Sequence, residues 1–195
     1  QGSGAGYLWL GHLATIYKVP ADGGAEALRA YPAAIQAGDL RGFHNLTMLY
    51  DQGGLVPRDP AKALEWALKG ARMGDADSWE DLETRLFERK EPEVLASFET
   101  LAQEGHAKAA FTLGLINHVA GSLPEMKTRG TYLRVVGLVE ALGLRGDRDR
   151  AYALFIQAAK GGDRRAYEWA ADAYAYGWGG VKPDAQEAER WKSLR

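Results

Sequence analysis

Several residue types and patterns are missing from this chain of 195 residues, and each absence excludes a class of protein. Because it has no cysteine, it has no disulfide framework, no thiolate metal site and no cysteine nucleophile. A formal net charge of −2 gives no long-range attraction to nucleic acid or to anionic lipid. The longest apolar run, residues 132–144, contains Arg134 and Glu140 and is too short to cross a bilayer, so we expect no transmembrane segment. With 46% hydrophobic residues the chain can still bury a substantial core, and we expect a single domain over residues 1–195.

Patterns that would indicate catalysis are also missing. The four histidines are His12, His44, His106 and His118, and no two of them have the i, i+4 spacing of a helical metal site. A metal site assembled from separate parts of the chain stays an alternative for them. The glycine pairs lack the phosphate-loop signature, and no Ser-His-Asp, paired-carboxylate or nucleotide motif is found. We therefore predict that the protein is not an enzyme, has no catalytic residue and holds no metal or cofactor.

Glycines that end alanine-rich runs recur along the chain as anchors of a repeat: Gly38, Gly74, Gly105 and Gly162. Four residues after each anchor comes a small residue: Gly42, Ser78, Ala109 and Ala166. Four positions after each small residue comes an apolar residue: Leu46, Leu82, Leu113 and Ala170. The amino end fits the same register with Gly6, Leu10 and Gly11. The period is about thirty-six residues, with one contracted unit and one unit that carries an insertion.

Each unit is predicted to be two antiparallel helices. The small residues let the first helix approach its neighbour closely, while Asp59 and Pro60 begin the second helix as a cap and a first turn. Gly74 is predicted to end that helix in a left-handed conformation. Because one such hairpin cannot cover its own apolar face, neighbouring hairpins must stack. We predict an all-α fold, a right-handed α-solenoid of about five hairpins, with units at about 6–38, 42–74, 78–105, 109–162 and 166–195.

Two units depart from this pattern. The first passes from Tyr17 through Pro20 to what we expect to be a short second helix. The fourth diverges after Gly121, and the stretch 132–142 within its insertion is apolar nearly all round. We predict an extra helix there, covered either by the solenoid or by a partner.

The second unit has the pattern by which the family can be named. Its Leu46, Tyr50, Gly53, Val56, Asp59, Lys62, Ala63, Trp66, Lys69, Ala71 and Gly74 resemble the Sel-one-like repeat, a relative of the tetratricopeptide repeat. The last unit matches at Ala166, Tyr174, Gly177, Val181, Asp184, Ala188 and Trp191. The resemblance implies a bacterial-type scaffold for protein–protein interaction, a role that a helical solenoid can fill for many different partners.

The tetratricopeptide analogy also implies where a partner binds, since its groove residues have fixed offsets from the repeat leucine. Carried over to this chain, the offsets place partner-binding residues on the first helix of each unit. The predicted partner-binding residues are His12, His44, Met48, Asp51, Gln52, Glu80, Thr84, Phe111, Leu115, His118, Glu168, Asp172 and Tyr176. They include carboxylates but no lysine or arginine, so we expect a partner segment with basic and apolar residues.

Two further features have competing interpretations. Arginines and one lysine between Arg145 and Arg165 are interleaved with aspartates, which favours a solvated helix face over an anion site. Among the tryptophans, Trp66 and Trp191 are predicted to be in the core, and Trp178, in a glycine-rich loop, to be the most exposed.

Three functions are consistent with these patterns. We favour an adaptor for one dedicated protein partner, in its sharper form an inhibitor or immunity protein of a bacterial toxin or effector, monomeric when free. The second is a periplasmic assembly factor in cell-envelope or polysaccharide export, and a hydrolase is the third. The opening QGSGAG is either a cloning remnant or the spacer after a removed export signal. We expect a periplasmic location, with the cytoplasm as the alternative.

Overall fold

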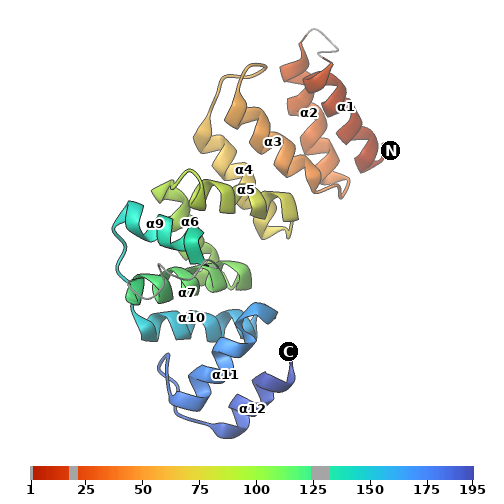
Figure 1. Cartoon of the computed structure of the whole chain (residues 1–195). Coiled ribbons are helices and arrows are strands. Elements are labelled where there is room, and N and C mark those ends of the chain that lie inside the picture. The colour runs from red at the N-terminus through yellow and green to blue at the C-terminus, as the bar shows by residue number, and fades with distance from the viewer. Residues whose placement is uncertain (1, 18–21, 124–131) are drawn as a thin grey trace. The chain divides into compact units, whose positions relative to one another are not determined.

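A computed structural model describes residues 2–17, 22–123 and 132–195 of the chain (Figure 1). Over these ranges it consists of α-helices joined by turns, with no strand, which confirms the predicted all-α class. The helices are α1 (Gly4–Ile16), α2 (Gly23–Gln36), α3 (Arg41–Gln52), α4 (Pro60–Arg72), α5 (Ala76–Phe87), α6 (Pro92–Gln103), α7 (Ala107–Gly121), α9 (Leu133–Leu142), α10 (Arg148–Lys160), α11 (Tyr167–Tyr176) and α12 (Ala185–Ser193). None of these helices is both long enough and apolar enough to cross a membrane.

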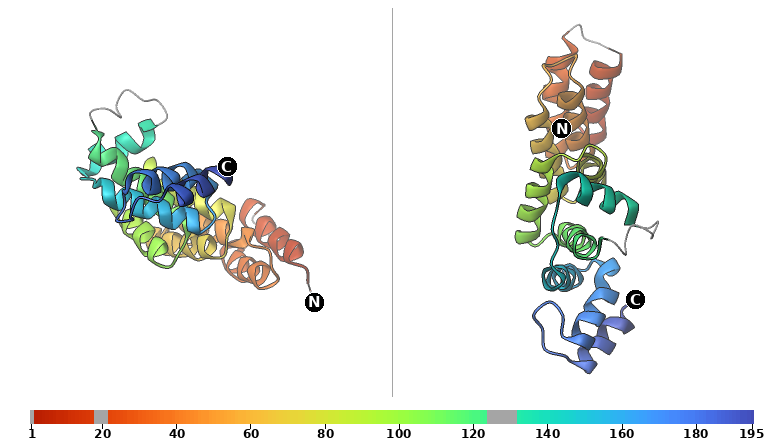
Figure 2. Two further views of the ribbon diagram at one scale, coloured as in Figure 1. Left: turned by 90° about the horizontal axis from the view of Figure 1, so that it is seen from below. Right: turned by 60° about the vertical axis from the view of Figure 1, so that its left-hand side comes forward.

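The chain divides into two compact units, Gln1–Thr84 and Arg85–Arg195, with the boundary in the last turn of α5. In the N-terminal unit, α1 packs on α2, α2 on α3 and α3 on α4. In the C-terminal unit, α7 packs on α6, α9 and α10, while α11 packs on α10 and α12 (Figure 2). Stacked helix pairs are therefore the building block of both units, as the repeat predicts.

The four anchor glycines share one backbone geometry. Their φ angles are 88°, 84°, 94° and 89° for Gly38, Gly74, Gly105 and Gly162, in the left-handed region that favours glycine. The residue after each glycine donates its N–H to the carbonyl five residues earlier, at 2.9, 2.9, 2.9 and 3.0 Å. This is the bonding of a Schellman motif, so α2, α4, α6 and α10 end in the same way.

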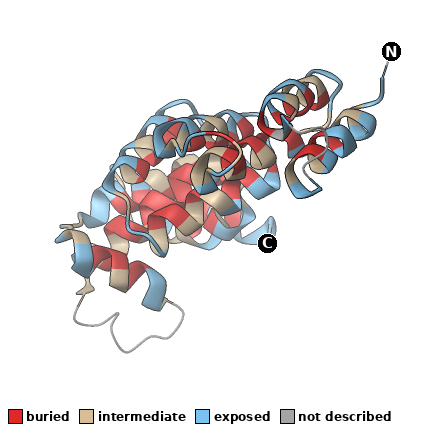
Figure 3. Ribbon diagram, turned by 90° about the horizontal axis from the view of Figure 1, so that it is seen from above, coloured by how far each residue is buried: buried red, intermediate tan, exposed pale blue. Residues whose placement is uncertain are grey.

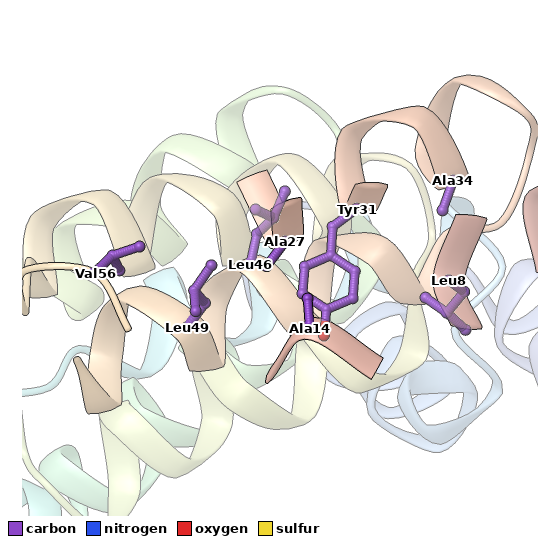
Figure 4. Packing of buried hydrophobic residues seen from close by; sticks show 8 residues of the cluster. All are labelled: Leu8, Ala14, Ala27, Tyr31, Ala34, Leu46, Leu49 and Val56. Atoms are coloured by element: carbon purple, nitrogen blue, oxygen red, sulfur yellow. The ribbon is translucent and has the colours of Figure 1, made fainter. Parts of the chain in front are cut away.

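The small and apolar positions of the repeat are buried, as predicted, in the second to last units. Gly42, Ser78, Ala109 and Ala166 are all buried, and the four residues that follow them at the next repeat position are at most 1% exposed. A Cβ on Gly42 would lie 2.6 Å from the carbonyl oxygen of Tyr31 on α2. In the N-terminal unit the resulting core gathers Tyr31, Leu46 and Leu49 among small alanines (Figure 4). On α3 and α4 burial thus follows one side of the helix, whereas α7 is buried on most sides (Figure 3).

Aspartates begin the second helices of the two units that match the repeat best. Asp59 accepts a hydrogen bond from the Lys62 N–H at 3.0 Å before α4. Asp184 accepts from the N–H groups of Gln186 and Glu187, at 2.9 and 3.1 Å, before α12. These caps confirm the predicted start of the helix.

The predicted extra helix exists as α9 and is inserted between two helices that pack on each other. It buries Val135, Val136, Leu138 and Val139, whereas Leu133 is 58% exposed. The partner of α10 is α7: a Cβ on Gly114 of α7 would lie 2.6 Å from the ring of Phe155 on α10. The part of the insertion at 124–131 lies outside the described residues.

Three details differ from the sequence predictions. The second helix of the first unit is not short, because α2 runs for 14 residues with Ala27, Tyr31 and Ala34 on its buried side; Pro20 lies outside the described residues. Leu10 is 46% exposed, since the helices of the N-terminal unit pack against the other side of α1. Trp178 is half-buried against Tyr152, while Trp9 is the tryptophan that is 63% exposed.

Candidate partner-binding surfaces

Side-chain hydrogen bonds connect α1, α3 and α5 in the N-terminal unit. His12 Nε2 and Asn45 Oδ1 lie 3.3 Å apart between α1 and α3. His44 Nδ1 and Asp81 Oδ2 lie 2.8 Å apart between α3 and α5. The two contacts leave α3 in the middle of a surface formed by α1, α3 and α5, which we call the A-helix face. Two hollows open on this face, one on each side of α3.

The first hollow, the neutral pocket, has a volume of about 420 Å³. It is lined by Thr15, Ile16, Tyr31, Asn45, Met48, Leu49, Gln52, Gly53, Gly54 and Leu55. The hydroxyls of Thr15 and Tyr31 are 3.0 Å apart. Burial raises the pKa of Tyr31, so its phenol stays protonated at neutral pH. Apolar walls with a few neutral polar groups suit an uncharged side chain or small ligand.

The second hollow, the acidic pocket, has a volume of about 320 Å³. It is lined by His44, Asp77, Glu80, Asp81 and Thr84. The hydrogen bond to Asp81 raises the pKa of His44 against the opposing effect of burial, and the charges of Asp81, Asp77 and Asp75 add to the rise. Three carboxylates face one imidazole, so the pocket favours a cationic group. Nowhere in the described ranges do three or more acidic or histidine side chains form a group that could hold a metal ion.

The predicted partner-binding residues of the N-terminal unit fall on or beside these hollows. Met48 and Gln52 line the neutral pocket, and the acidic pocket includes His44, Glu80 and Thr84. His12 joins α1 to α3 at the bond described above. Asp51 is half-buried, and its carbonyl oxygen accepts a 2.8 Å hydrogen bond from Arg58 Nε.

In the C-terminal unit, aromatic rings form a continuous cluster over α7, α10, α11 and the loop that follows α11. Phe155 stacks on Trp169 with ring centroids 4.5 Å apart, and His118 meets Trp169 edge-on at 4.8 Å. Further along, the Tyr152 and Trp178 rings are 4.7 Å apart, and Trp178 contacts Tyr176 at 4.8 Å. The cluster runs from the core to the surface, since Phe155 is fully buried and Tyr176 is 64% exposed.

The predicted partner-binding residues of this unit are more scattered. His118 and Tyr176 belong to the aromatic cluster, and Leu115 is half-buried. Phe111 is buried instead of exposed, because its ring packs on Phe155 at 5.8 Å and the Arg165 guanidinium lies over it. It therefore offers little surface to a partner.

Asp172 and Glu168 are close enough to influence each other on α11. Burial raises the pKa of the half-buried Asp172, and the negative charge of Glu168 raises it further. Glu168 itself pairs with Arg195 at 2.6 Å. The two carboxylates thus differ: Asp172 is half-buried, and Glu168 is engaged in an ion pair at the surface.

The sequence argument did not identify Asp77 and Asp81 of the acidic pocket. The two residues are four apart on α5, a spacing that places both on one helical face. The contact of Asp81 with His44, however, joins positions 37 residues apart in the sequence.

A third hollow, of about 320 Å³, is lined by Arg164 and Arg165 of the basic stretch and by Lys108. Arg165 is bonded to Asp163 at 2.7 Å there, in line with locally neutralised charge.

Comparison with known proteins places this repeat in a family. The model of the Sel1 repeat matches residues 42–75, 136–163 and 165–191. The first and last matches coincide closely with the second and fifth predicted units. The middle one covers most of α9 and all of α10, although α10 packs on α7. No curated protein matches the sequence.

Three solved structures have a similar fold. A Sel1 repeat protein from Oxalobacter formigenes is 22% identical with a TM-score of 0.46, covering 98% of this chain and 69% of its own. A protective antigen with an SLR fold, present in uropathogenic Escherichia coli strains, is 24% identical with a TM-score of 0.45. That alignment covers 99% of this chain but 38% of the antigen. An immunity protein from Pseudomonas aeruginosa is 20% identical with a TM-score of 0.38, covering 86% of this chain and 72% of its own.

Sel1 repeats are typical of non-catalytic scaffolds for protein interaction. The chain therefore carries Sel1 repeats at these three segments, which fall in both compact units.

Proposed function

We propose that the protein is a scaffold that captures one dedicated protein partner on the A-helix face of its N-terminal unit. The observation on which this rests is the pair of hollows beside α3, one neutral and one lined by three carboxylates. Met48 of the neutral pocket and His44 of the acidic pocket are one helical turn apart on α3, so a short partner segment can reach both.

The chemistry of the pockets defines the segment. An apolar side chain enters the neutral pocket, where Met48, Leu49 and Leu55 contact it. A lysine or arginine nearby enters the acidic pocket, where Asp77 and Glu80 pair with it. The apolar anchor supplies most of the affinity, since buried anchors dominate interfaces, while the charged contact governs the rate of association and its salt dependence.

The experiment is selection of peptides on the purified protein from a random library, followed by titration of the enriched peptides. We expect enriched sequences with a basic residue near an apolar one. Met48→Ala is expected to weaken binding about tenfold or more, and Glu80→Lys to weaken it severalfold with a flatter salt dependence. Glu93→Lys on α6, also an exposed glutamate on a helix, is the matched control and leaves binding unchanged. Enriched peptides that bind Met48→Ala and Glu80→Lys as well as the original protein would contradict the proposed site.

The finer role proposed is that of an inhibitor or immunity protein for a bacterial toxin or effector. The support is sequence-level: degenerate units and an inserted helix fit one dedicated partner better than periodic recognition of a repetitive one. Under the alternative, a periplasmic assembly factor, the partner is a component of the cell envelope. Capture from the native host, with Met48→Ala as the negative bait, distinguishes the two by the identity of the protein retained. A periplasmic location is part of the same proposal and is tested by fractionation of host cells.

A further inference from the structure

The repeat gives the neutral pocket a counterpart in the C-terminal unit. In the N-terminal unit α1 packs on α2 and α2 on α3, and in the C-terminal unit α7 packs on α10 and α10 on α11. Tyr31 of α2 lies seven residues before the anchor Gly38, as Phe155 of α10 lies seven residues before Gly162. The helices α1, α2 and α3 around the neutral pocket therefore correspond to α7, α10 and α11.

The central ring is seated in the same way in both units. A Cβ on Gly11 of α1 would meet ring carbons of Tyr31, and a Cβ on Gly114 of α7 would meet ring carbons of Phe155. Both rings are buried, at 2% and 0% exposed. Because a glycine of the helix packed on it admits each ring, Tyr31 and Phe155 are equivalent in packing as well as in register.

A tryptophan in one unit corresponds to an asparagine in the other. Trp169 follows Gly162 by seven residues, and Asn45 follows Gly38 by seven residues. The indole of Trp169 stacks on Phe155, with ring centroids 4.5 Å apart. The shorter side chain of Asn45 is part of the wall of the neutral pocket.

A second position shows the same change in size. His118 lies five residues after Leu113, and its ring meets Trp169 edge-on with centroids 4.8 Å apart. Thr15 lies five residues after Leu10 and lines the neutral pocket. Where two rings meet in the C-terminal unit, the N-terminal unit therefore has two small polar side chains beside a hollow of about 420 Å³.

The hydroxyl of Tyr31 gives the neutral pocket a hydrogen-bond acceptor. Thr15 donates its O–H to the backbone carbonyl of Gly11 at 3.0 Å. The Thr15 oxygen lies 3.0 Å from the Tyr31 hydroxyl and accepts there, because a threonine has only one O–H to donate. The Tyr31 hydroxyl is then the donor of that bond, and its own oxygen keeps lone pairs that can accept. An indole N–H is a donor only, so it matches this acceptor.

We propose that the neutral pocket binds a tryptophan of the partner, with its ring in the place that corresponds to Trp169 and its indole N–H on the Tyr31 hydroxyl. The inference rests on the proposed function, because it specifies the apolar side chain that enters this pocket. Tyr31 is nearly buried, so the ring takes its apolar contacts from Ile16, Met48 and Leu55. Met48 suits an aromatic ring in particular, since a thioether makes favourable contacts with ring edges. A leucine would gain neither this contact nor the hydrogen bond.

Nuclear magnetic resonance titration of the isotope-labelled 195-residue chain with N-acetyl-tryptophanamide tests the proposal. We expect shifts of the amide resonances of Gly53 and Gly54, which line the pocket. N-acetyl-leucinamide is expected to bind about tenfold more weakly. The derivative methylated on the indole nitrogen is expected to bind about three- to tenfold more weakly, because one hydrogen bond is lost. Equal binding of either comparison compound, or no shift at the two glycines, would overturn the proposal.

A tryptophan supplied by the chain itself tests the correspondence between the units. Asn45→Trp places an indole at the position of Trp169 and is expected to fill the pocket, so that N-acetyl-tryptophanamide no longer binds. Gln36→Trp is the matched control, because Gln36 is exposed in the same unit but outside the pocket. Circular dichroism checks that both variants fold, and if Asn45→Trp does not, the three compounds on the original protein decide. A folded Asn45→Trp variant that binds the compound as well as Gln36→Trp would contradict the correspondence.

Peptide selection separates this inference from the proposed function. Enriched peptides that carry a tryptophan near a basic residue support both. Enriched peptides that need Met48 but carry leucine in place of tryptophan would leave the proposed function standing and overturn the choice of ring. Binding of N-acetyl-tryptophanamide in the pocket without any enriched peptide supports the choice of ring and counts against the proposed function.

Discussion

Two glycine-to-alanine substitutions in the C-terminal unit are expected to change its stability in opposite directions. Gly114 lies in α7 and Gly137 in α9, each inside a helix. At both positions alanine has a higher helix propensity than glycine, and this difference is worth about 0.5–1 kcal/mol of unfolding free energy. The difference lies in what the new methyl group meets.

At Gly137 a Cβ has nothing within 4 Å, so the propensity gain is kept and Gly137→Ala stabilises the unit by about 0.5–1 kcal/mol. At Gly114 the Cβ would lie 2.6 Å from the Phe155 ring, well inside van der Waals contact. That ring cannot turn aside easily, because it is fully buried and stacked on Trp169 at 4.5 Å. Overpacking of this kind costs about 1–3 kcal/mol, so Gly114→Ala is expected to destabilise by about 1–2 kcal/mol after the propensity gain.

Urea unfolding followed by circular dichroism at 222 nm measures both changes as shifts of the transition midpoint. The pair also tests which helix packs on α10. If α9 were its partner, as the sequence match over 136–163 alone would imply, Gly137 would be the crowded position and Gly114 the free one. A midpoint that rises for Gly114→Ala and falls for Gly137→Ala would refute the packing of α7 on α10.

Three further outcomes follow from the structure. Asp184→Ala removes the acceptor of two backbone N–H groups at the start of α12 and is expected to lower the unfolding free energy by about 1 kcal/mol. Urea titration measures this loss, and Asp184→Asn is expected to keep most of the stabilisation by the cap. Trp66→Ala is expected to cost about 2 kcal/mol, less than for a fully buried tryptophan, because Trp66 is only half-buried against Phe43 and Lys69; a cost above 4 kcal/mol would contradict that partial burial. The pKa of His44 is raised in the folded state, so its pairing with Asp81 stabilises fully below the unfolded pKa of histidine and less as the pH rises through the folded pKa. Thermal melts from pH 5 to 8 are expected to show this loss in the original protein but not in His44→Gln.

The repeat could be read from the sequence because its positions have backbone and packing roles that few residue types can fill. A left-handed φ near 88° at Gly38 and the close approach of Gly42 to α2 both require glycine or a very small residue. Such positions recur at a fixed period, so the helix pairs were predictable. The inserted helix was predictable for another reason: ten apolar-rich residues in a row need cover wherever they lie.

The site was less predictable, because the sequence does not say which face of a helix is covered. In α7 nine of fifteen residues are buried, so no polar stripe distinguishes the inner from the outer side, and Phe111 was assigned to the surface. Leu10 was assigned to the core because its equivalents Leu46 and Leu82 are core residues, yet no helix covers that side of α1 within the unit. The acidic pocket requires His44 and Asp81 to meet across 37 residues, which only the packing of α3 with α5 decides.

Several of the residues that line the two hollows occupy positions that the repeat leaves free, whereas Gly53 of the neutral pocket belongs to the repeat pattern. On α3 the repeat specifies Gly42 and Leu46, which face the core, whereas Asn45, Met48 and Gln52 lie at the neutral pocket. Folding therefore imposes little on the chemistry of the A-helix face. The outcome differs between the units: carboxylates and a neutral pocket in the first, an aromatic cluster that reaches Tyr176 in the second. A repetitive ligand would need the same groups at every pair, so this difference favours a single partner with a surface of its own.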